Sequence, residues 1–148
     1  MRRKLPRGGA LLPEDPRQRV IVATAVILLE AAHADDRFTD EEERLVHGIL
    51  QRFFNLDEER SRELMALSAR VREQSIDLWQ FTSTINREVT GEEKQRIIEL
   101  LWEVVYADRR LDRYEDHLLH KLCRVLQVSH GDMIRAKLQV REKLEGTS

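Results

Sequence analysis

Apolar residues return every three or four positions along most of this chain, the spacing that places them on one face of an α-helix. Rare glycines and prolines separate the runs, and so do predicted capping residues at helix starts: Thr39, Asp57, Asp77, Thr90 with Glu93, and Asp112. No alternating run indicates a strand. The pattern predicts helices at about 16–34, 39–54, 57–73, 90–107, 112–126 and 129–144, and a short one that begins at 77. We therefore expect an all-α fold, a single compact domain of about seven helices over 15–145. Residues 1–14 should form a flexible basic tail, and 146–148 should fray.

The first helix is expected to lie at the centre of this domain. Residues 20–29 are apolar on nearly every side, which is typical of a helix buried all round. The run is shorter than the ~20 apolar residues that span a bilayer, so we expect no transmembrane segment. The composition also favours helix over sheet, since 35% of residues are charged and only six are glycine.

An internal repeat organises the chain, because residues 27–53 can be laid on 100–126 without a gap. The identical pairs include Glu30 and Glu103, Ala34 and Ala107, Asp35 and Asp108, Arg37 and Arg110, Glu42 and Glu115, Leu45 and Leu118, and His47 and His120. Repeating units that cannot bury their apolar faces alone tend to pack together. The repeat predicts two helical hairpins related by a pseudo-twofold axis, with the third and fourth helices between them.

The turn inside each repeat carries the first candidates for chemistry, Asp35 with Glu42 and Asp108 with Glu115. Carboxylates at this spacing can bind a hard cation such as Ca²⁺ or Mg²⁺. Alternatively, the glutamates complete capping boxes and the aspartates close the turns by bonding local N–H groups. The spacing alone favours caps, and neither turn has the central glycine of an EF-hand loop.

Glu30 and Glu103 are stronger candidates for a functional site, because they interrupt apolar helices one turn before the aspartates. An unpaired buried carboxylate is costly, so each should have a partner. We favour ion pairs with Arg37 and Arg110, and the alternative is one acidic cluster with the turn aspartates. The candidate metal set is therefore Glu30, Asp35, Glu42, Glu103, Asp108 and Glu115.

Histidines on two helices offer weaker metal-binding pairs. These are Glu43 with His47, Asp116 with His120, and His117 with His120. Two ligands are too few for a zinc site, so helix-surface pairs are the favoured interpretation.

Other features argue against catalysis and nucleic-acid binding. The sequence has no phosphate-binding glycine loop and no metalloprotease or hydrolase motif. The single cysteine, Cys123, occupies an apolar helix position and should be a core residue in a reducing compartment. Net charge is −2, and the basic tail has no interleaved aromatics. We expect a cytoplasmic protein that is not an enzyme and does not bind nucleic acid.

Two segments carry a likeness to a known family. They are 28–43, which contains Leu-Leu-Glu-Ala-Ala-His-Ala-Asp, and 99–119, which contains Leu-Leu-Trp-Glu-Val-Val-Tyr-Ala-Asp. Residues 133–138 are similar too. On these, the chain resembles the tellurite-resistance TerB-like family, in a short bacterial branch, over about 17–145. The resemblance implies an all-helical domain with internal twofold similarity and an acidic surface for a divalent metal.

Carried over by position, the family's acids fall on Asp35 and Asp108 in the turns and on Glu42 and Glu115 at the helix starts. The family commonly has glycine after the turn aspartate, where this chain has Asp36 and Arg109. A non-glycine residue at a left-handed position costs up to about 1–2 kcal/mol, although Asp tolerates it better. The departure and the added positive charge weaken metal binding at the second turn more than at the first.

The resemblance also implies association with stress-response or membrane-linked proteins rather than catalysis. Three hypotheses follow for this chain. The first is a non-enzymatic TerB-like accessory protein that binds a divalent cation, Ca²⁺ or Mg²⁺, and acts through protein partners. The alternative is a metal-free structural interaction module whose acids are caps and ion pairs. The sequence leaves a homodimer and peripheral membrane association open. A carboxylate hydrolase, the third hypothesis, would need a closed pocket and an acid of raised pKa.

Overall fold

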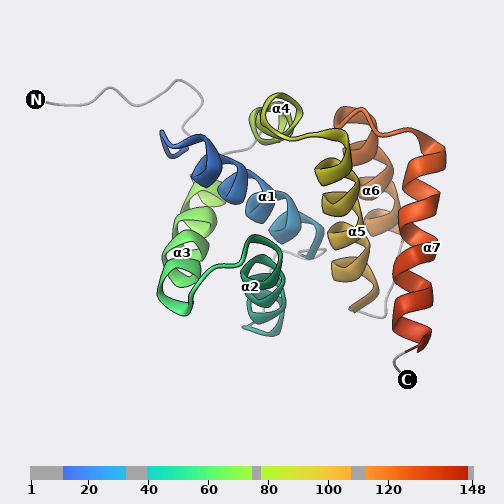
Figure 1. Cartoon of the computed structure of the whole chain (residues 1–148), viewed down its shortest axis with the longest axis horizontal. Helices are drawn as coiled ribbons and strands as arrows, with labels where there is room; N and C mark the ends of the chain where they lie inside the picture. The colour runs from blue at the N-terminus through green and yellow to red at the C-terminus, as the bar shows by residue number, and fades with distance from the viewer. Residues whose placement is uncertain (1–11, 33–39, 75–77, 108–112, 147–148) are drawn as a thin grey trace, which may run out of the picture.

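The computed structural model describes residues 12–32, 40–74, 78–107 and 113–146, and all of their regular structure is helical. The helices are α1 (Pro16–Ala32), α2 (Asp40–Phe54), α3 (Glu58–Gln74), α4 (Trp79–Glu88), α5 (Gly91–Ala107), α6 (Arg113–Val125) and α7 (His130–Gly146) (Figure 1). The predicted all-α class is confirmed, and so is the number of helices within the described ranges. No helix among these residues combines the length and apolarity that crossing a membrane requires.

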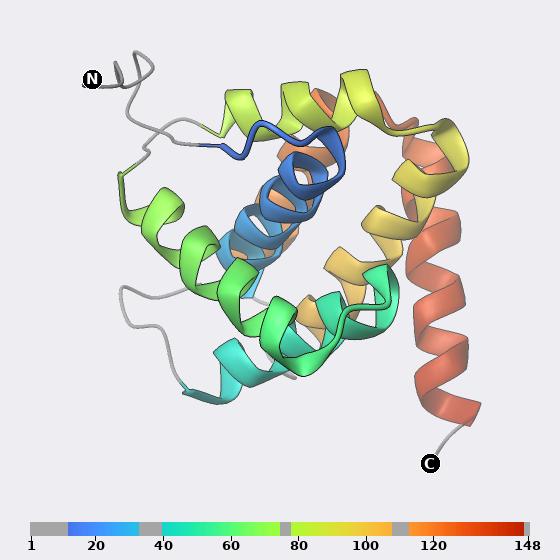
Figure 2. The same cartoon turned by 60° about the vertical axis from the view of Figure 1, so that its left-hand side comes forward.

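Helix α1 forms the centre of the fold, as its all-round apolar pattern predicts. Residues 21–29 are all buried, and α2, α3, α4 and α5 pack around them. Figure 2 shows α1 running through the middle of the molecule, with α3 and α4 on different sides of it. Helix α5 is the second organising element, because it packs on α1 with one side and on α7 with another.

The two repeats bury equivalent positions. Residues 27, 28, 29, 31 and 32 on α1 are buried, and so are 100, 101, 102, 104 and 105 on α5. The following helices α2 and α6 also match, since 46, 49 and 50 are buried together with 119, 122 and 123. The repeat thus predicted the core correctly, whereas the pseudo-twofold relation between the hairpins stays a prediction.

Helices α2 and α6 end in the same way, with a residue in the left-handed conformation. Asn55 has φ 54° and Gln127 has φ 61°. The next residue then bonds back to the helix, from Leu56 N to the Gln51 carbonyl at 3.0 Å and from Val128 N to the Cys123 carbonyl at 2.9 Å. This hydrogen bond satisfies a carbonyl that a helix end would otherwise leave free. It also fixes the direction in which α3 leaves α2, which shapes the surface described below.

Helix starts follow the predicted capping residues wherever these are described. Thr90 Oγ1 accepts from the Glu93 N–H at 3.2 Å and donates to the Glu93 carboxylate at 3.3 Å. Asp57 Oδ1 accepts from the Arg60 N–H at 2.7 Å. The predicted capping boxes at Thr39 and Asp112, and the predicted cap Asp77, lie outside the described residues.

Candidate functional site

The structure describes only two of the six candidate metal ligands in full. Glu30 on α1 and Glu103 on α5 are described in full. Asp35 and Asp108 lie outside the described residues, and so do the side chains of Glu42 and Glu115. A cation site at the turns therefore remains a prediction.

Glu30 forms an ion pair that joins two helices. Its Oε2 accepts from Arg72 Nε on α3 at 3.1 Å, and both side chains are largely covered, with 26% and 21% of their surface exposed. The predicted partner Arg37 lies outside the described residues. The pair explains how a carboxylate can stand at the end of an apolar helix, since the guanidinium offsets its desolvation.

Glu103 also faces an arginine, in a looser arrangement. Its Oε1 lies 3.9 Å from Arg52 NH2 on α2, and the Arg52 side chain is 67% exposed. The predicted partner Arg110 again lies outside the described residues. The two equivalent glutamates therefore reach different helices, α3 for Glu30 and α2 for Glu103, so this feature is not repeated between the two halves.

The described part of the candidate set does not fit a divalent cation. Each glutamate already has a guanidinium beside it, and a cation would have to displace that positive charge. Within the described ranges, no group of three or more His, Cys, Asp or Glu side chains is placed to hold a metal ion. The metal prediction therefore depends on the acids of the two turns.

A groove lies between α2 and α3, and we call it the α2–α3 groove. Its volume is about 600 Å³, and its lining comprises Asp40, Glu43, Arg44 and His47 from α2 and Glu58, Arg62, Met65 and Ala66 from α3. A second hollow of about 230 Å³ shares Glu43 and Met65 with it and continues along α3 to Ala69 and Glu73. The sequence analysis placed Glu43 and His47 on one helix face but did not predict the groove.

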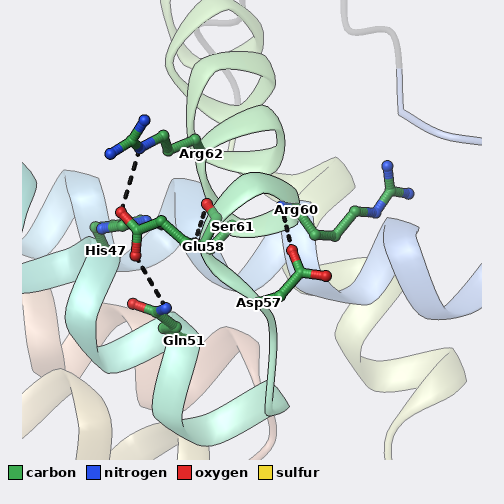
Figure 3. A network of polar contacts seen from close by, with 7 residues as sticks. All are labelled: His47, Gln51, Asp57, Glu58, Arg60, Ser61 and Arg62. Carbon is green, nitrogen blue, oxygen red and sulfur yellow. Dashed lines mark hydrogen bonds and ion pairs between the residues drawn. The ribbon is translucent and has the colours of Figure 1, made fainter.

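A hydrogen-bond network connects α2 to α3 beside the α2–α3 groove (Figure 3). His47 Nε2 lies 2.7 Å from the hydroxyl of Ser61, a residue that is 1% exposed. Ser61 Oγ in turn donates to the Glu58 carbonyl at 3.0 Å. The network connects the middle of α2 to the first turn of α3.

The Glu58 carboxylate adds a second connection across the same groove. Its Oε1 accepts from Arg62 Nε and its Oε2 from Gln51 Nε2, both at 3.2 Å. The i,i+4 spacing of Glu58 and Arg62 was visible in the sequence. No local pattern predicted Ser61 or Gln51 as partners, because their contacts depend on the packing of α2 against α3.

The other described histidines lie on α6 and α7. His120 on α6 stacks on His130 at the start of α7, with ring centroids 5.9 Å apart. His117 is exposed, and the side chain of Asp116 lies outside the described residues. The predicted metal pairs on α6 therefore stay predictions.

Two described groups have displaced pKa values, and neither provides a nucleophile or a base. Burial raises the pKa of the Cys123 thiol to about 12, so the thiolate needed for nucleophilic chemistry does not form near neutral pH. Burial also raises the pKa of Glu99 on α5, while Lys143 and Arg96 oppose the shift. Neither residue lines the α2–α3 groove.

Comparison with known proteins adds one finding. The family model described as tellurite resistance protein TerB matches residues 21–138, a segment that contains most of α1, all of α2 to α6 and the first half of α7. No curated protein and no solved structure matches the chain significantly. The matched segment includes both repeats and the whole α2–α3 groove.

Proposed function

The chain belongs to the tellurite resistance TerB family, and from this premise we propose that it is a non-enzymatic accessory protein that acts through a protein partner in a bacterial stress response. The single observation that carries the proposal is the α2–α3 groove. It is open, has a volume of about 600 Å³ and combines charged walls with the apolar surface of Met65 and Ala66. Such a mixed surface is typical of a docking site for another protein rather than of a closed catalytic pocket.

A cytoplasmic site of action is part of this proposal, because the single cysteine is free and buried. The alternative function differs only in the cation. In a metal-free interaction module, the turn acids would be helix caps, just as Asp57 and Thr90 cap α3 and α5. In a cation-binding accessory protein, Asp35, Glu42, Asp108 and Glu115 would hold Ca²⁺ or Mg²⁺, with Glu30 and Glu103 retained in their ion pairs.

A substitution that obstructs the α2–α3 groove tests whether a partner protein binds there. Ala66 is an exposed helical residue of the groove, so Ala66→Arg adds a long side chain there at little cost in helix stability. We expect proteins that co-purify with the wild-type chain from its host to be lost with Ala66→Arg. They should be retained with Gln139→Arg, which adds the same side chain on the exposed face of α7. Equal recovery with both variants would contradict a partner at this groove.

Thermal unfolding tests the cation. We expect Ca²⁺ or Mg²⁺ at about ten times its dissociation constant to add roughly 1.4 kcal/mol to the free energy of unfolding of chelator-stripped protein. The double change Asp35→Asn with Asp108→Asn should abolish that gain. As a control of equal charge, Glu142→Gln with Glu145→Gln on the exposed face of α7 should preserve it. If Ca²⁺, Mg²⁺, Mn²⁺ and Zn²⁺ all leave the wild-type midpoint unchanged, the metal-free alternative is supported.

A further inference from the structure

We propose that the α2–α3 groove binds a lysine or arginine side chain from a basic segment of the partner protein, with the Glu43 carboxylate and the Nδ1 lone pair of His47 as its acceptors. The inference rests on the proposed function and specifies the chemistry of the partner. Three features of the groove carry it: the tautomer of His47, the balance of charge and the apolar floor.

Hydrogen bonding at Ser61 is the basis on which we assign the tautomer of His47. A serine hydroxyl has one hydrogen, and Ser61 donates it to the Glu58 carbonyl at 3.0 Å. Its oxygen can then accept from His47 Nε2, which lies 2.7 Å away, and this arrangement, with the proton on Nε2, satisfies both contacts. In the neutral imidazole the other nitrogen, Nδ1, is therefore an acceptor. Nδ1 has no hydrogen-bond partner among the described residues, and His47 lines the groove.

The charges of the groove leave an excess of acid. Both oxygens of Glu58 are engaged, one by Arg62, so these two side chains offset each other. Arg44 donates through Nε to the Asp40 carbonyl at 3.4 Å and is the only other cation in the lining. The carboxylates of Asp40 and Glu43 share the groove with it, and neither forms an ion pair with a described side chain. An incoming ammonium or guanidinium group complements this balance, whereas an anion does not.

The shape of the groove suits a long cationic side chain. Met65 and Ala66 on α3 give an apolar surface for the methylene stem, and the head group would meet Glu43 and His47 on α2. The adjoining hollow, which also contains Glu43, extends past Ala69 to Arg72 and Glu73, and the guanidinium of Arg72 is engaged by Glu30. A second basic residue of the same segment can therefore reach another carboxylate. Lysine and arginine carry only N–H donors on their head groups, which matches two acceptors placed side by side on one helix face.

Peptide titration followed by NMR of the ¹⁵N-labelled full chain tests the inference. The probe is the peptide acetyl-Ala-Lys-Leu-Arg-Ala-amide, and the control is the same peptide with both basic residues replaced by glutamate. We expect the basic peptide to shift amide signals of α2 and α3 at the groove, and the acidic peptide to leave them unchanged. Comparable binding of the acidic peptide, or shifts confined to another face, would overturn the proposal.

Two substitutions separate the acceptors from general charge. Glu43→Gln should weaken binding of the basic peptide roughly tenfold, because it removes a charge-assisted acceptor from the groove. Glu142→Gln, an equal charge change on the exposed face of α7, should have no measurable effect. If the two variants bind equally well, long-range charge and not the groove explains the affinity.

Substitution of His47 tests its role. His47→Phe keeps an aromatic ring but removes both nitrogens, so the acceptor at Nδ1 is lost. Binding of the basic peptide should weaken severalfold in His47→Phe, whereas His47→Gln, whose amide still donates and accepts, should retain most of it. The same binding in His47→Phe as in the wild-type chain would exclude Nδ1 as an acceptor.

The outcome can be separated from that of the proposed function. If Ala66→Arg abolishes partner capture while the basic peptide fails to bind, the groove is a docking site of different chemistry and only this inference is overturned. If Ala66→Arg and Gln139→Arg capture the same proteins and the peptide still binds as described, the groove recognises basic segments but the proposed partner site is wrong.

Discussion

Replacement of Trp102 by alanine should lower the free energy of unfolding by about 3–5 kcal/mol, the range for truncation of a fully buried large aromatic. Trp102 on α5 is 1% exposed, its Nε1 donates to the Met133 carbonyl of α7 at 3.2 Å, and the Lys137 ammonium lies 5.3 Å from its ring centroid. The alanine variant therefore leaves a cavity and loses the hydrogen bond from α5 to the Met133 carbonyl. Urea unfolding measures the loss.

The same substitution should loosen α7 more than the rest of the fold. Helix α7 packs mainly on α5 within the described structure, and Trp102 lies at that contact. Hydrogen exchange should therefore accelerate first in α7 of Trp102→Ala. Trp79 provides the matched control, because it is 64% exposed and Trp79→Ala should change the free energy of unfolding by less than about 0.5 kcal/mol. A small effect at both positions would mean that the α5–α7 contact contributes little to global stability.

The sequence predicted the helices and the core well, for a physical reason. Apolar spacing reports which face of a helix is buried, and the capping residues report where it begins. For this reason residues 21–29, the Thr90–Glu93 capping box and the buried positions of both repeats agree with the structure. The repeat was informative because equivalent apolar positions in two copies of one pattern are expected to be buried in the same way.

The sequence could not identify the partners of the polar side chains. Glu30 and Glu103 were expected beside Arg37 and Arg110 of their own turns, which lie outside the described residues. Among the described residues, their partners are Arg72 of α3 and Arg52 of α2, which the sequence did not indicate. Both arginines are far away along the chain, and their positions depend on how helices cross. Ser61 and Gln51 were missed for the same reason. A serine that faces solvent and a serine that hydrogen-bonds a histidine of another helix cannot be told apart from the neighbouring sequence.

The difference between the two glutamate pairs has a consequence for the metal hypothesis. In the Glu30–Arg72 pair both side chains are mostly covered and lie 3.1 Å apart, so removing one partner leaves a poorly solvated charge. In the Glu103–Arg52 pair the distance is 3.9 Å and Arg52 is 67% exposed, so water can replace the contact. Equivalent residues of the repeat should thus contribute unequally to stability.

A double-mutant cycle measures that inequality. Glu30→Gln and Arg72→Gln should each lower the free energy of unfolding by about 2 kcal/mol, and the double variant should lose little more than either single variant. The corresponding changes at Glu103 and Arg52 should each cost less than about 1 kcal/mol, with a coupling below about 0.5 kcal/mol. Urea unfolding of the six variants gives both coupling energies. A different result would contradict this account: Glu30→Gln leaves the stability of the cation-free protein unchanged and yet abolishes a stability gain from a cation. Glu30 would then be a metal ligand, and its ion pair with Arg72 would not explain the carboxylate at the end of α1.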